Sequence, residues 1–281
     1  MLSKINGFMI ELYDYKFNSD EAILSKIRWL PKLTRTGVDM GMQGWDLIGR
    51  ALKDFNFLKD PGISLKVHSN CSGTEILPAE VFFRDESGLP ELERYALDLC
   101  QGRVLDVGAG AGCHSLILQG RGIQVTAADI SHDAVKVMEE RGLSHVIEVD
   151  VNSWETGDKF DTILMLMNGI GLVGDLDGLN SFLNHVKAMI TPGGQLLLDS
   201  TDFTLFPEFM NTWGAAQLRQ GRYFGEVEYR IEYQGLVSEA YSWLFVDYKT
   251  LIDYAHEAGW FCQIIFEEEG QYLARLTRHE E

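Results

Sequence analysis

Glycine and acidic residues follow one another in a short stretch of the chain. Asp106 is followed at alternate positions by Gly108, Gly110 and Gly112, and Asp129 ends the next apolar run. Glycine tolerates a positive φ, and its missing Cβ lets a ligand approach the backbone closely. A carboxylate can accept two hydrogen bonds from vicinal hydroxyl groups, such as those of a ribose. These residue types in this order predict a site for a ligand that contains a nucleoside.

The spacing of the glycines separates two classes of cofactor. The dinucleotide pattern Gly-x-Gly-x-x-Gly would need a glycine at position 113, where the chain has Cys113. A pyrophosphate favours the unpaired N–H groups of a helix start, which the turn is expected to present, but Asp106 would repel it. We therefore expect a cofactor that carries an ammonium and a sulfonium group and no phosphate.

Apolar runs and helical periodicity alternate around this stretch. A helix over 91–99 is expected to lead into the first strand, and a helix over 248–260 and strands over 261–266 and 271–277 to close the chain. The alternation predicts an α/β fold, a doubly wound Rossmann-like, mostly parallel sheet with helices on both faces and an antiparallel last strand. The expected strands are 104–107, 124–128, 146–149, 161–166 and 195–199, and the expected helices are 113–120, 132–141 and 178–189.

The motifs resemble, in order, those of class I S-adenosylmethionine (SAM) dependent methyltransferases, over roughly residues 90 to 281. The glycine turn resembles the first motif of that family, Asp129 its ribose-binding acid, and Asp150 with Val151 its adenine-contacting pair. Residues 160–168 are similar to the fourth strand, and 191–194 to the turn before the fifth. The resemblance implies SAM as cofactor, bound by Asp106, Gly108, Ala109, Gly110, His114, Asp129, Ile130, Asp150, Val151, Met167 and Asn168.

Methyl transfer from a sulfonium needs positioning more than it needs a particular catalytic group. A base is required only where the acceptor is protonated at the working pH. His114 is the candidate nearest the expected methionine end, because its ordinary pKa is close to neutrality. The alternative is a helix-start residue that faces solvent or touches only the cofactor. His132 and His185 are expected to be exposed helix residues, so the sequence names no certain catalytic residue.

The remaining segments predict two additions to the core. Residues 1–90 are expected to form a helical cap, with helices over 21–30 and 45–55. Within it, 73–84 either lines the pocket or is an apolar linker with Arg84 in a surface ion pair. The core would occupy 91–281 with an insertion at about 202–245, where an alternating strand over 225–233 turns at 234–235 into a hairpin with 237–246. Its charged face is either solvated or a contact for substrate or a dimer partner.

Four glycines between residues 168 and 178 predict a mobile loop beside the cofactor, at the edge where such sheets carry function. The Asp/Asn-Pro-Pro-Tyr signature of enzymes that methylate nucleic-acid bases is absent there.

Composition narrows the partners. The 281 residues carry a formal charge of −18, which disfavours nucleic acid and anionic membranes as partners. No apolar run approaches the ~20 residues of a membrane span, and no signal-peptide core opens the sequence. The four cysteines form no metal-binding or disulfide pattern, so we expect no metal and a cytoplasmic protein. These cysteines are Cys71, Cys100, Cys113 and Cys262.

The sequence thus favours a SAM-dependent methyltransferase that acts on a small molecule or another acceptor that is not nucleic acid. Two alternatives stay open, a non-catalytic SAM-binding module and an NAD(P)-dependent oxidoreductase, against which Cys113 speaks. The acceptor, its reacting atom and the oligomeric state are left open.

Overall fold

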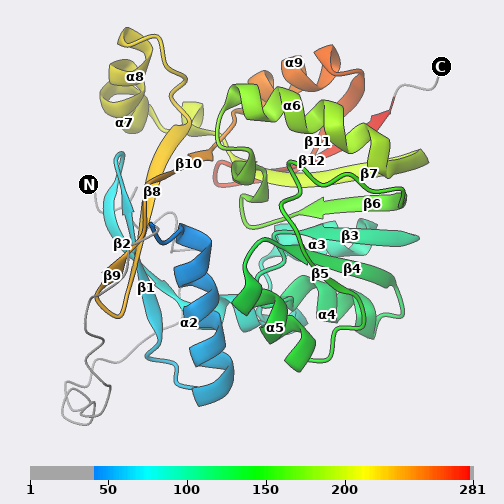
Figure 1. Cartoon of the computed structure of the whole chain (residues 1–281). Helices are drawn as coiled ribbons and strands as arrows, with labels where there is room; N and C mark the ends of the chain where they lie inside the picture. The colour runs from blue at the N-terminus through cyan, green and yellow to red at the C-terminus, as the bar shows by residue number, and fades with distance from the viewer. Residues whose placement is uncertain (1–40, 279–281) are drawn as a thin grey trace.

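The computed structural model describes residues 41–278, and the helix expected over 21–30 lies outside them. A seven-stranded sheet forms its larger part, in the order β11-β12-β7-β6-β3-β4-β5 (Figure 1). Neighbours from β5 to β7 pair in parallel, whereas β12 pairs antiparallel with both β7 and β11. The expected sheet with one reversed strand is therefore confirmed. The strands are β3 Arg103–Val107, β4 Gln124–Asp129, β5 Val146–Glu148, β6 Phe160–Met165, β7 Ile190–Thr201, β11 Trp260–Glu268 and β12 Gln271–Arg278.

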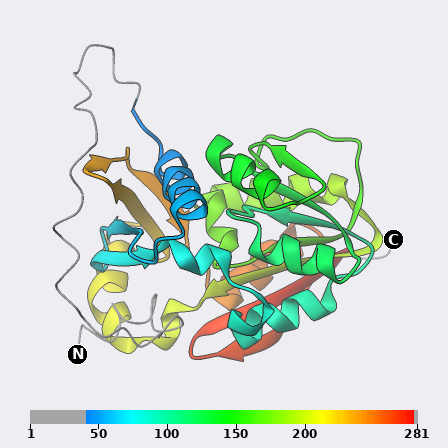
Figure 2. The same ribbon diagram turned by 90° about the horizontal axis from the view of Figure 1, so that it is seen from below.

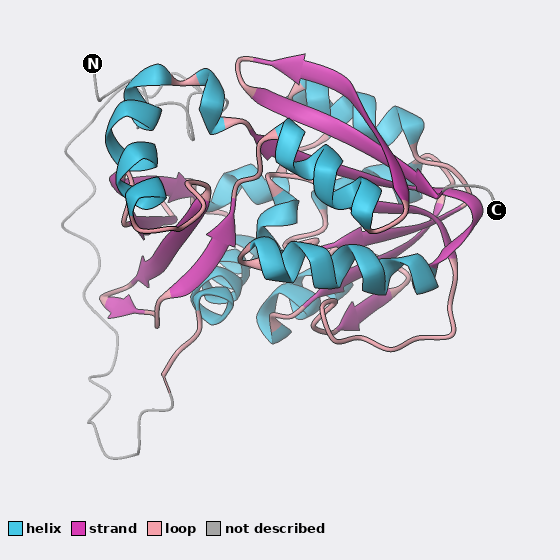
Figure 3. Ribbon diagram, turned by 90° about the horizontal axis from the view of Figure 1, so that it is seen from above, coloured by secondary structure: helices cyan, strands magenta, loops and turns pink. Residues whose placement is uncertain are grey.

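Helices cover both faces of this sheet (Figure 3). Side chains of a strand alternate between faces, so Val104 packs with α3 and α4 whereas Leu105 joins the cluster under α6 and α9. Both faces are buried, which is why the parallel strands are almost continuously apolar. The helices are α3 Glu91–Leu99, α4 Cys113–Gly120, α5 His132–Glu140, α6 Leu176–Val186 and α9 Tyr248–Glu257.

A smaller antiparallel sheet stands beside the carboxyl ends of the parallel strands (Figures 1 and 3). It joins two segments that lie before and after the parallel strands in the sequence, in the order β10-β8-β1-β2, with β9 on β8. The helical cap expected at the N-terminal side thus contains a hairpin that the sequence analysis missed. The strands are β1 Ser64–Ser69, β2 Gly73–Pro78, β8 Glu226–Tyr233, β9 Leu236–Val237 and β10 Tyr241–Leu244.

The hairpin expected around residues 234–235 is present, but its return strand is divided into β9 and β10. Ser238 occupies the break. Its backbone N–H donates to the carbonyl of Ile231 at 2.8 Å, and its hydroxyl accepts from the N–H of Ile231 at 2.9 Å. A side chain thus replaces one backbone partner where the strand is interrupted.

Helix α2 (Gly44–Leu58), expected over 45–55, joins the two sheets (Figure 2). Leu47 and Ala51 pack against the small sheet, whereas Leu52 packs against Ala134 and Val137 of α5. The helix is apolar on two sides because it is buried by both parts of the molecule.

Short helical segments connect these elements. None of the described helices combines the length and the apolarity that crossing a bilayer requires. The short segments are η2 Ala79–Phe83, η3 Glu86–Gly88, η4 Gly169–Val173, η5 Lys187–Met189, η6 Phe203–Leu205, α7 Pro207–Phe209, the π-helix η7 Met210–Gly214 and α8 Ala215–Arg219.

The glycine-rich segment expected to be a mobile loop contains the 3-10 helix η4. Ile170 is 0% exposed, and Gly169, Gly171 and Val173 are also buried. A Cβ at Gly171 would lie 2.0 Å from the indole nitrogen of Trp243 in β10. At this position glycine therefore permits close packing against the small sheet.

Candidate active site

A cavity of about 1050 Å³ lies between the carboxyl ends of the parallel strands and the small sheet. Ligand pockets usually measure ~300–1,000 Å³, so this cavity has room for two small ligands. The structure brings all the residues expected to bind the cofactor to its wall. They are Asp106, Gly108, Ala109, Gly110, His114, Asp129, Ile130, Asp150, Val151, Met167 and Asn168.

The glycine turn uses its own N–H groups within the protein. Gly108 and Gly110 have φ values of 69° and 58°, which glycine adopts readily. The N–H groups of Gly108 and Ala109 both donate to the carbonyl of Ala128, at 2.9 and 3.1 Å. The N–H of Gly110 donates to Oδ2 of Asp129 at 2.8 Å. These three N–H groups are paired within the protein, so they do not form a cradle for a pyrophosphate.

Asp129 ends β4 and holds the turn in place. Besides Gly110, its carboxylate accepts the N–H of Ser131 at Oδ1, at 2.8 Å. A carboxylate has about four lone-pair sites, so Asp129 keeps acceptor capacity for a hydroxyl donor from a ligand. Burial raises the pKa of Asp129 to about 6 in spite of the N–H groups that stabilise its charge. The side chain is therefore ionised at neutral pH and half-buried, unlike an ordinary surface acid.

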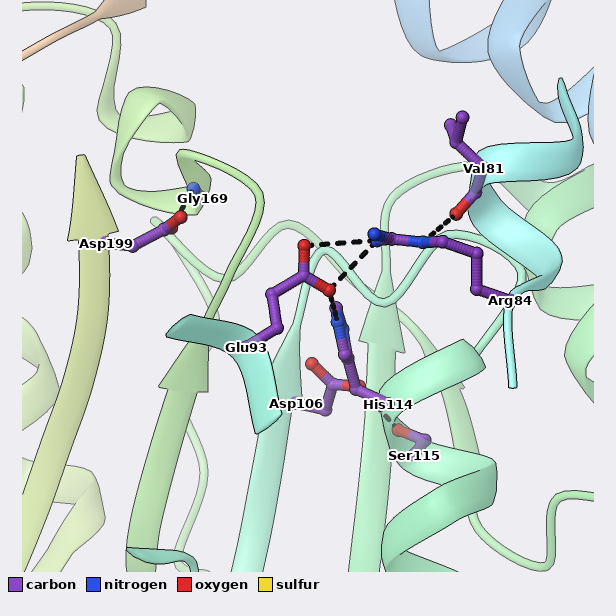
Figure 4. A network of polar contacts seen from close by, with 8 residues as sticks. All are labelled: Val81, Arg84, Glu93, Asp106, His114, Ser115, Gly169 and Asp199. Carbon is purple, nitrogen blue, oxygen red and sulfur yellow. Dashed lines mark hydrogen bonds and ion pairs between the residues drawn. The ribbon is translucent and has the colours of Figure 1, made fainter. Parts of the chain in front are cut away.

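Asp106 lies on β3 at the floor of the cavity and is 2% exposed. Its Oδ2 accepts the hydroxyl hydrogen of Ser115 at 2.6 Å (Figure 4). Burial raises the pKa of Asp106, because the charged form is poorly solvated there. Among the described residues no lysine or arginine forms an ion pair with it, so a cationic group of a ligand would be a favourable partner.

The other expected cofactor contacts come from two turns. Oδ1 of Asp150 accepts the N–H of Asn152 at 3.0 Å, and Val151 is buried beside it. Met167 and Asn168 follow β6 with φ values of 64° and 55°. Two successive residues other than glycine in the left-handed region are uncommon, and such backbone strain gathers at functional sites. The amide oxygen of Asn168 accepts from the hydroxyl of Thr201 at 2.9 Å, which fixes its orientation.

Three charged side chains form a buried network next to this wall (Figure 4). Glu93 of α3 accepts from Nη2 of Arg84 at 2.9 Å and contacts Nε2 of His114 at 2.7 Å. All three side chains are at most 8% exposed. The ion pair of Arg84 is therefore buried, and the alternative that placed it on the surface is wrong. No role for Glu93 could be predicted, because no local pattern in the sequence reveals its partners.

His114 is held in this network as a cation. Burial alone would lower the pKa of His114, but its contacts with Cys113 and Glu93 raise the pKa well above its usual value. A protonated imidazole cannot accept a proton, and it does not face solvent either. His132 and His185 do not line the cavity. His132 is exposed and pairs with Glu148 at 2.6 Å, whereas His185 is half-buried on α6.

Asp199 is a cavity residue to which the sequence analysis gave no role. It lies near the carboxyl end of β7, is 2% exposed, and accepts the N–H of Gly169 at 3.3 Å. Burial raises the pKa of Asp199 to about 7. An acid at the end of a predicted strand was the available signal, and the same argument had singled out Asp129.

The small sheet supplies the opposite wall of the cavity. Tyr229 of β8 and Tyr241 and Trp243 of β10 line it, together with Glu75 of β2. The segment 73–84 therefore contributes to the pocket, as one of its two interpretations expected. Along the part of this wall that the structure describes there is no lysine or arginine. The carboxylates of the cavity are Glu75, Glu93, Asp106, Asp129, Asp150, Asp199 and Glu269.

Comparison with known proteins adds independent information. Residues 104–194 match the family model described as a methyltransferase domain. A SAM-dependent methyltransferase from Bacteroides fragilis, solved in complex with S-adenosyl-L-homocysteine, is 35% identical. It superposes with a TM-score of 0.74 over 85% of this chain and 97% of that one.

Two further relatives match over a shorter region. A ubiquinone biosynthesis O-methyltransferase of Xanthomonas oryzae pv. oryzae is 30% identical over 115 residues, 38% of this chain and 46% of that protein. A glycine N-methyltransferase of Rattus norvegicus is 28% identical over 119 residues, 36% of this chain and 41% of that protein. The match therefore spans less than half of the length of these two relatives.

Proposed function

The chain belongs to the class I SAM-dependent methyltransferases, and we propose that it transfers the methyl group of SAM to a small-molecule acceptor inside the cavity. The observation that carries this proposal is the pairing of the glycine turn with Asp129. The N–H groups of the turn are satisfied within the protein, whereas the carboxylate keeps lone pairs for a ligand. Such a site suits a ribose and offers little to a pyrophosphate, which disfavours the oxidoreductase alternative.

The donor set along the core wall fits SAM group by group. Asp129 would accept the ribose hydroxyls, Asp106 would face the ammonium, and Asp150 with Val151 would contact the adenine. The backbone at Gly108, Ala109 and Gly110 would allow close approach, with Ile130, Met167 and Asn168 completing the wall. His114 would act as a positioning residue, because its charge keeps Glu93 and α3 in place, and not as the general base considered from the sequence.

Bound SAM supplies a methyl carbon on a sulfonium, whose sulfur leaves with the electron pair of the broken C–S bond. The protein's part is to hold the acceptor's lone pair in line with that bond, an effect that can supply ~7–11 kcal/mol. Where the acceptor atom carries a proton, that proton must also leave. Asp199 is the carboxylate we propose to accept it, since its pKa of about 7 lies near the working pH.

Two observations support a small acceptor. The cavity lies between the two sheets, its described lining contains no lysine or arginine, and the charge of His114 is paired with Glu93, so nothing there would bind a phosphate backbone. All four cysteines are free thiols, which fits the reducing cytoplasm that we propose as the location.

Calorimetric titration with SAM, S-adenosylhomocysteine and NADH tests the cofactor. We expect micromolar binding of the two sulfur compounds, no binding of NADH, and at least tenfold weaker SAM binding in Asp129→Ala. Asp158→Ala removes an exposed acid outside the cavity and should bind like the wild type. Binding of NADH without SAM would overturn the proposal. A screen of small acceptors with labelled SAM then separates an enzyme from a non-catalytic binding module by turnover.

A further inference from the structure

We propose that the methyl acceptor is an amine that binds as its ammonium ion against Tyr229, Tyr241 and Trp243, beside Glu75. This inference deepens the proposed function and rests on it. It names the charge of the substrate that the acceptor side of the cavity recognises. Before transfer the ammonium group gives one N–H proton to Asp199, the base proposed above, so that the nitrogen gains the lone pair that attacks the methyl carbon while sulfur leaves with the electrons of the C–S bond.

The three rings form a continuous aromatic wall on one face of the small sheet. Tyr241 lies opposite Tyr229 across the β8–β10 pairing, and Trp243 follows two residues later on the same face. The ring centroid of Tyr229 is 6.1 Å from that of Tyr241 and 6.4 Å from that of Trp243. All three line the cavity. The π-faces of tyrosine and tryptophan attract cations, most strongly where water is excluded.

Two hydroxyl groups of this wall have unused hydrogen-bonding capacity. Tyr229 is 8% exposed, and Tyr241 is half-buried. No described residue forms a hydrogen bond with either hydroxyl oxygen, although buried polar groups are ordinarily paired. An ammonium group has three N–H donors, and a hydroxyl oxygen can accept them. The wall therefore lacks the kind of partner that a protonated amine would supply.

Glu75 places a negative charge beside the rings. Glu75 of β2 is opposite Val67 of β1, which in turn is opposite Ile231 of β8, and both of these apolar residues line the cavity. The only hydrogen bond to its carboxylate from a described residue comes from the hydroxyl of Ser72, at 3.1 Å. Burial raises the pKa of Glu75, and burial together with the nearby charge of Glu75 raises the pKa of Tyr229. A bound cation would stabilise the charged form of Glu75.

The remaining charges of the cavity point to the same class of ligand. Asp106, Asp129 and Asp150 face the cofactor in the proposed arrangement, and Glu93 is neutralised by Arg84 and His114. Glu75, Asp199 and Glu269 form no ion pair with a described residue. An anionic acceptor would meet these like charges and no lysine or arginine. An ammonium ion meets opposite charge and aromatic faces together.

The 3-10 helix η4 links this wall to the cofactor side. The wall touches it where Trp243 packs on Gly171, and the next residue, Leu172, lies against Gly108, where an added Cβ would be 2.9 Å from its Cδ1. A ligand on the aromatic wall is therefore adjacent to the glycine turn, as an acceptor must be.

Three compounds of nearly the same shape test the charge preference. They are 2-phenylethylamine, 2-phenylethanol and 3-phenylpropionate, which are cationic, neutral and anionic at pH 7. Each is titrated by NMR into the full chain saturated with S-adenosylhomocysteine, after the affinity for that compound has been measured in the same sample. We expect the amine to bind about tenfold more tightly than the alcohol, and the carboxylate to bind least.

Variants then assign the preference to the wall. Glu75→Gln and Trp243→Leu should each reduce the ratio of amine to alcohol affinity at least threefold, with unchanged binding of S-adenosylhomocysteine. Glu80→Gln is the matched control, because Glu80 is an exposed acid of the same segment outside the cavity.

The outcomes separate the two proposals. Failure of S-adenosylhomocysteine to bind would overturn the proposed function. Normal binding of that compound, combined with equal affinities for the three probes, tighter binding of the carboxylate, or no binding of any probe, would overturn only the amine proposal. An unchanged ratio in Glu75→Gln would do the same.

Discussion

Gly171 and Trp243 approach so closely that a side-chain carbon on the glycine would lie 2.0 Å from the indole nitrogen. The contact joins η4, which follows the fourth parallel strand, to β10 of the small sheet. The two walls of the cavity are therefore held together at a position where only glycine fits.

Gly171→Ala should destabilise the protein by about 1–3 kcal/mol, because the added methyl group overpacks the contact with the indole. Urea unfolding measures the change. Gly157→Ala is the control, since a Cβ there meets nothing within 4 Å, and it should leave stability nearly unchanged. Equal stability of the two variants would mean that the contact relaxes without cost.

The affinity for SAM should fall as the pH is lowered through about 6, where Asp129 becomes protonated and loses acceptor capacity. Between pH 7 and pH 5 we expect about a tenfold loss, the change that one pH unit below the pKa produces. Calorimetry across this range measures it. Asp129→Asn should bind SAM weakly at every pH, and its affinity should depend much less on pH than that of the wild type. A steep pH dependence in this variant would mean that another group is responsible for the titration.

Glu93→Gln should cost about 3–5 kcal/mol of stability, because it removes the counter-charge from the buried Arg84 and His114. Denaturant unfolding measures the loss. Glu91→Gln changes an exposed residue at the start of the same helix and should stay within about 0.5 kcal/mol of the wild type. A small effect of both substitutions would show that the network contributes little to folding.

Asp199→Asn should stabilise the protein without ligand, and more so at pH 8 than at pH 5. The pKa of Asp199 is about 7 in the folded protein against an ordinary 3.8, so the stability it contributes is complete below pH 4. That contribution is lost as the pH rises through 7, and the neutral amide avoids the loss. We expect the stability difference between variant and wild type to grow by about 2–3 kcal/mol from pH 5 to pH 8. A stability difference between variant and wild type that does not change with pH would contradict the raised pKa of Asp199.

Much of the core could be predicted because its signals are local. Buried parallel strands such as β3 and β4 are short apolar runs, and their carboxyl ends meet at one edge of the sheet. Asp106 and Asp129 could therefore be placed in a common site from their positions alone. The acid of β7, Asp199, followed the same rule and could have been found in the same way.

The cavity wall formed by the small sheet could not be predicted because it depends on pairing between distant strands. Lys66 and Glu232 are opposite one another in the small sheet although 166 residues separate them. No turn connects β1 to β8 and fixes that register. Only one position of β1 is fully buried, so the strand has no clear alternation of apolar and polar residues to show which face is covered. The same holds for Glu93 and His114, whose contact arises only when α3 docks beside α4.

The pairing of β1 with β8 also sets an order of events during synthesis. The first hairpin leaves the ribosome before any strand of the core, and its partner follows more than 150 residues later. At about 5–20 residues per second, β1 waits on the order of 10–30 s with an open edge. The small sheet, which supplies one wall of the cavity, is thus completed only after the parallel strands β3 to β7 have been made.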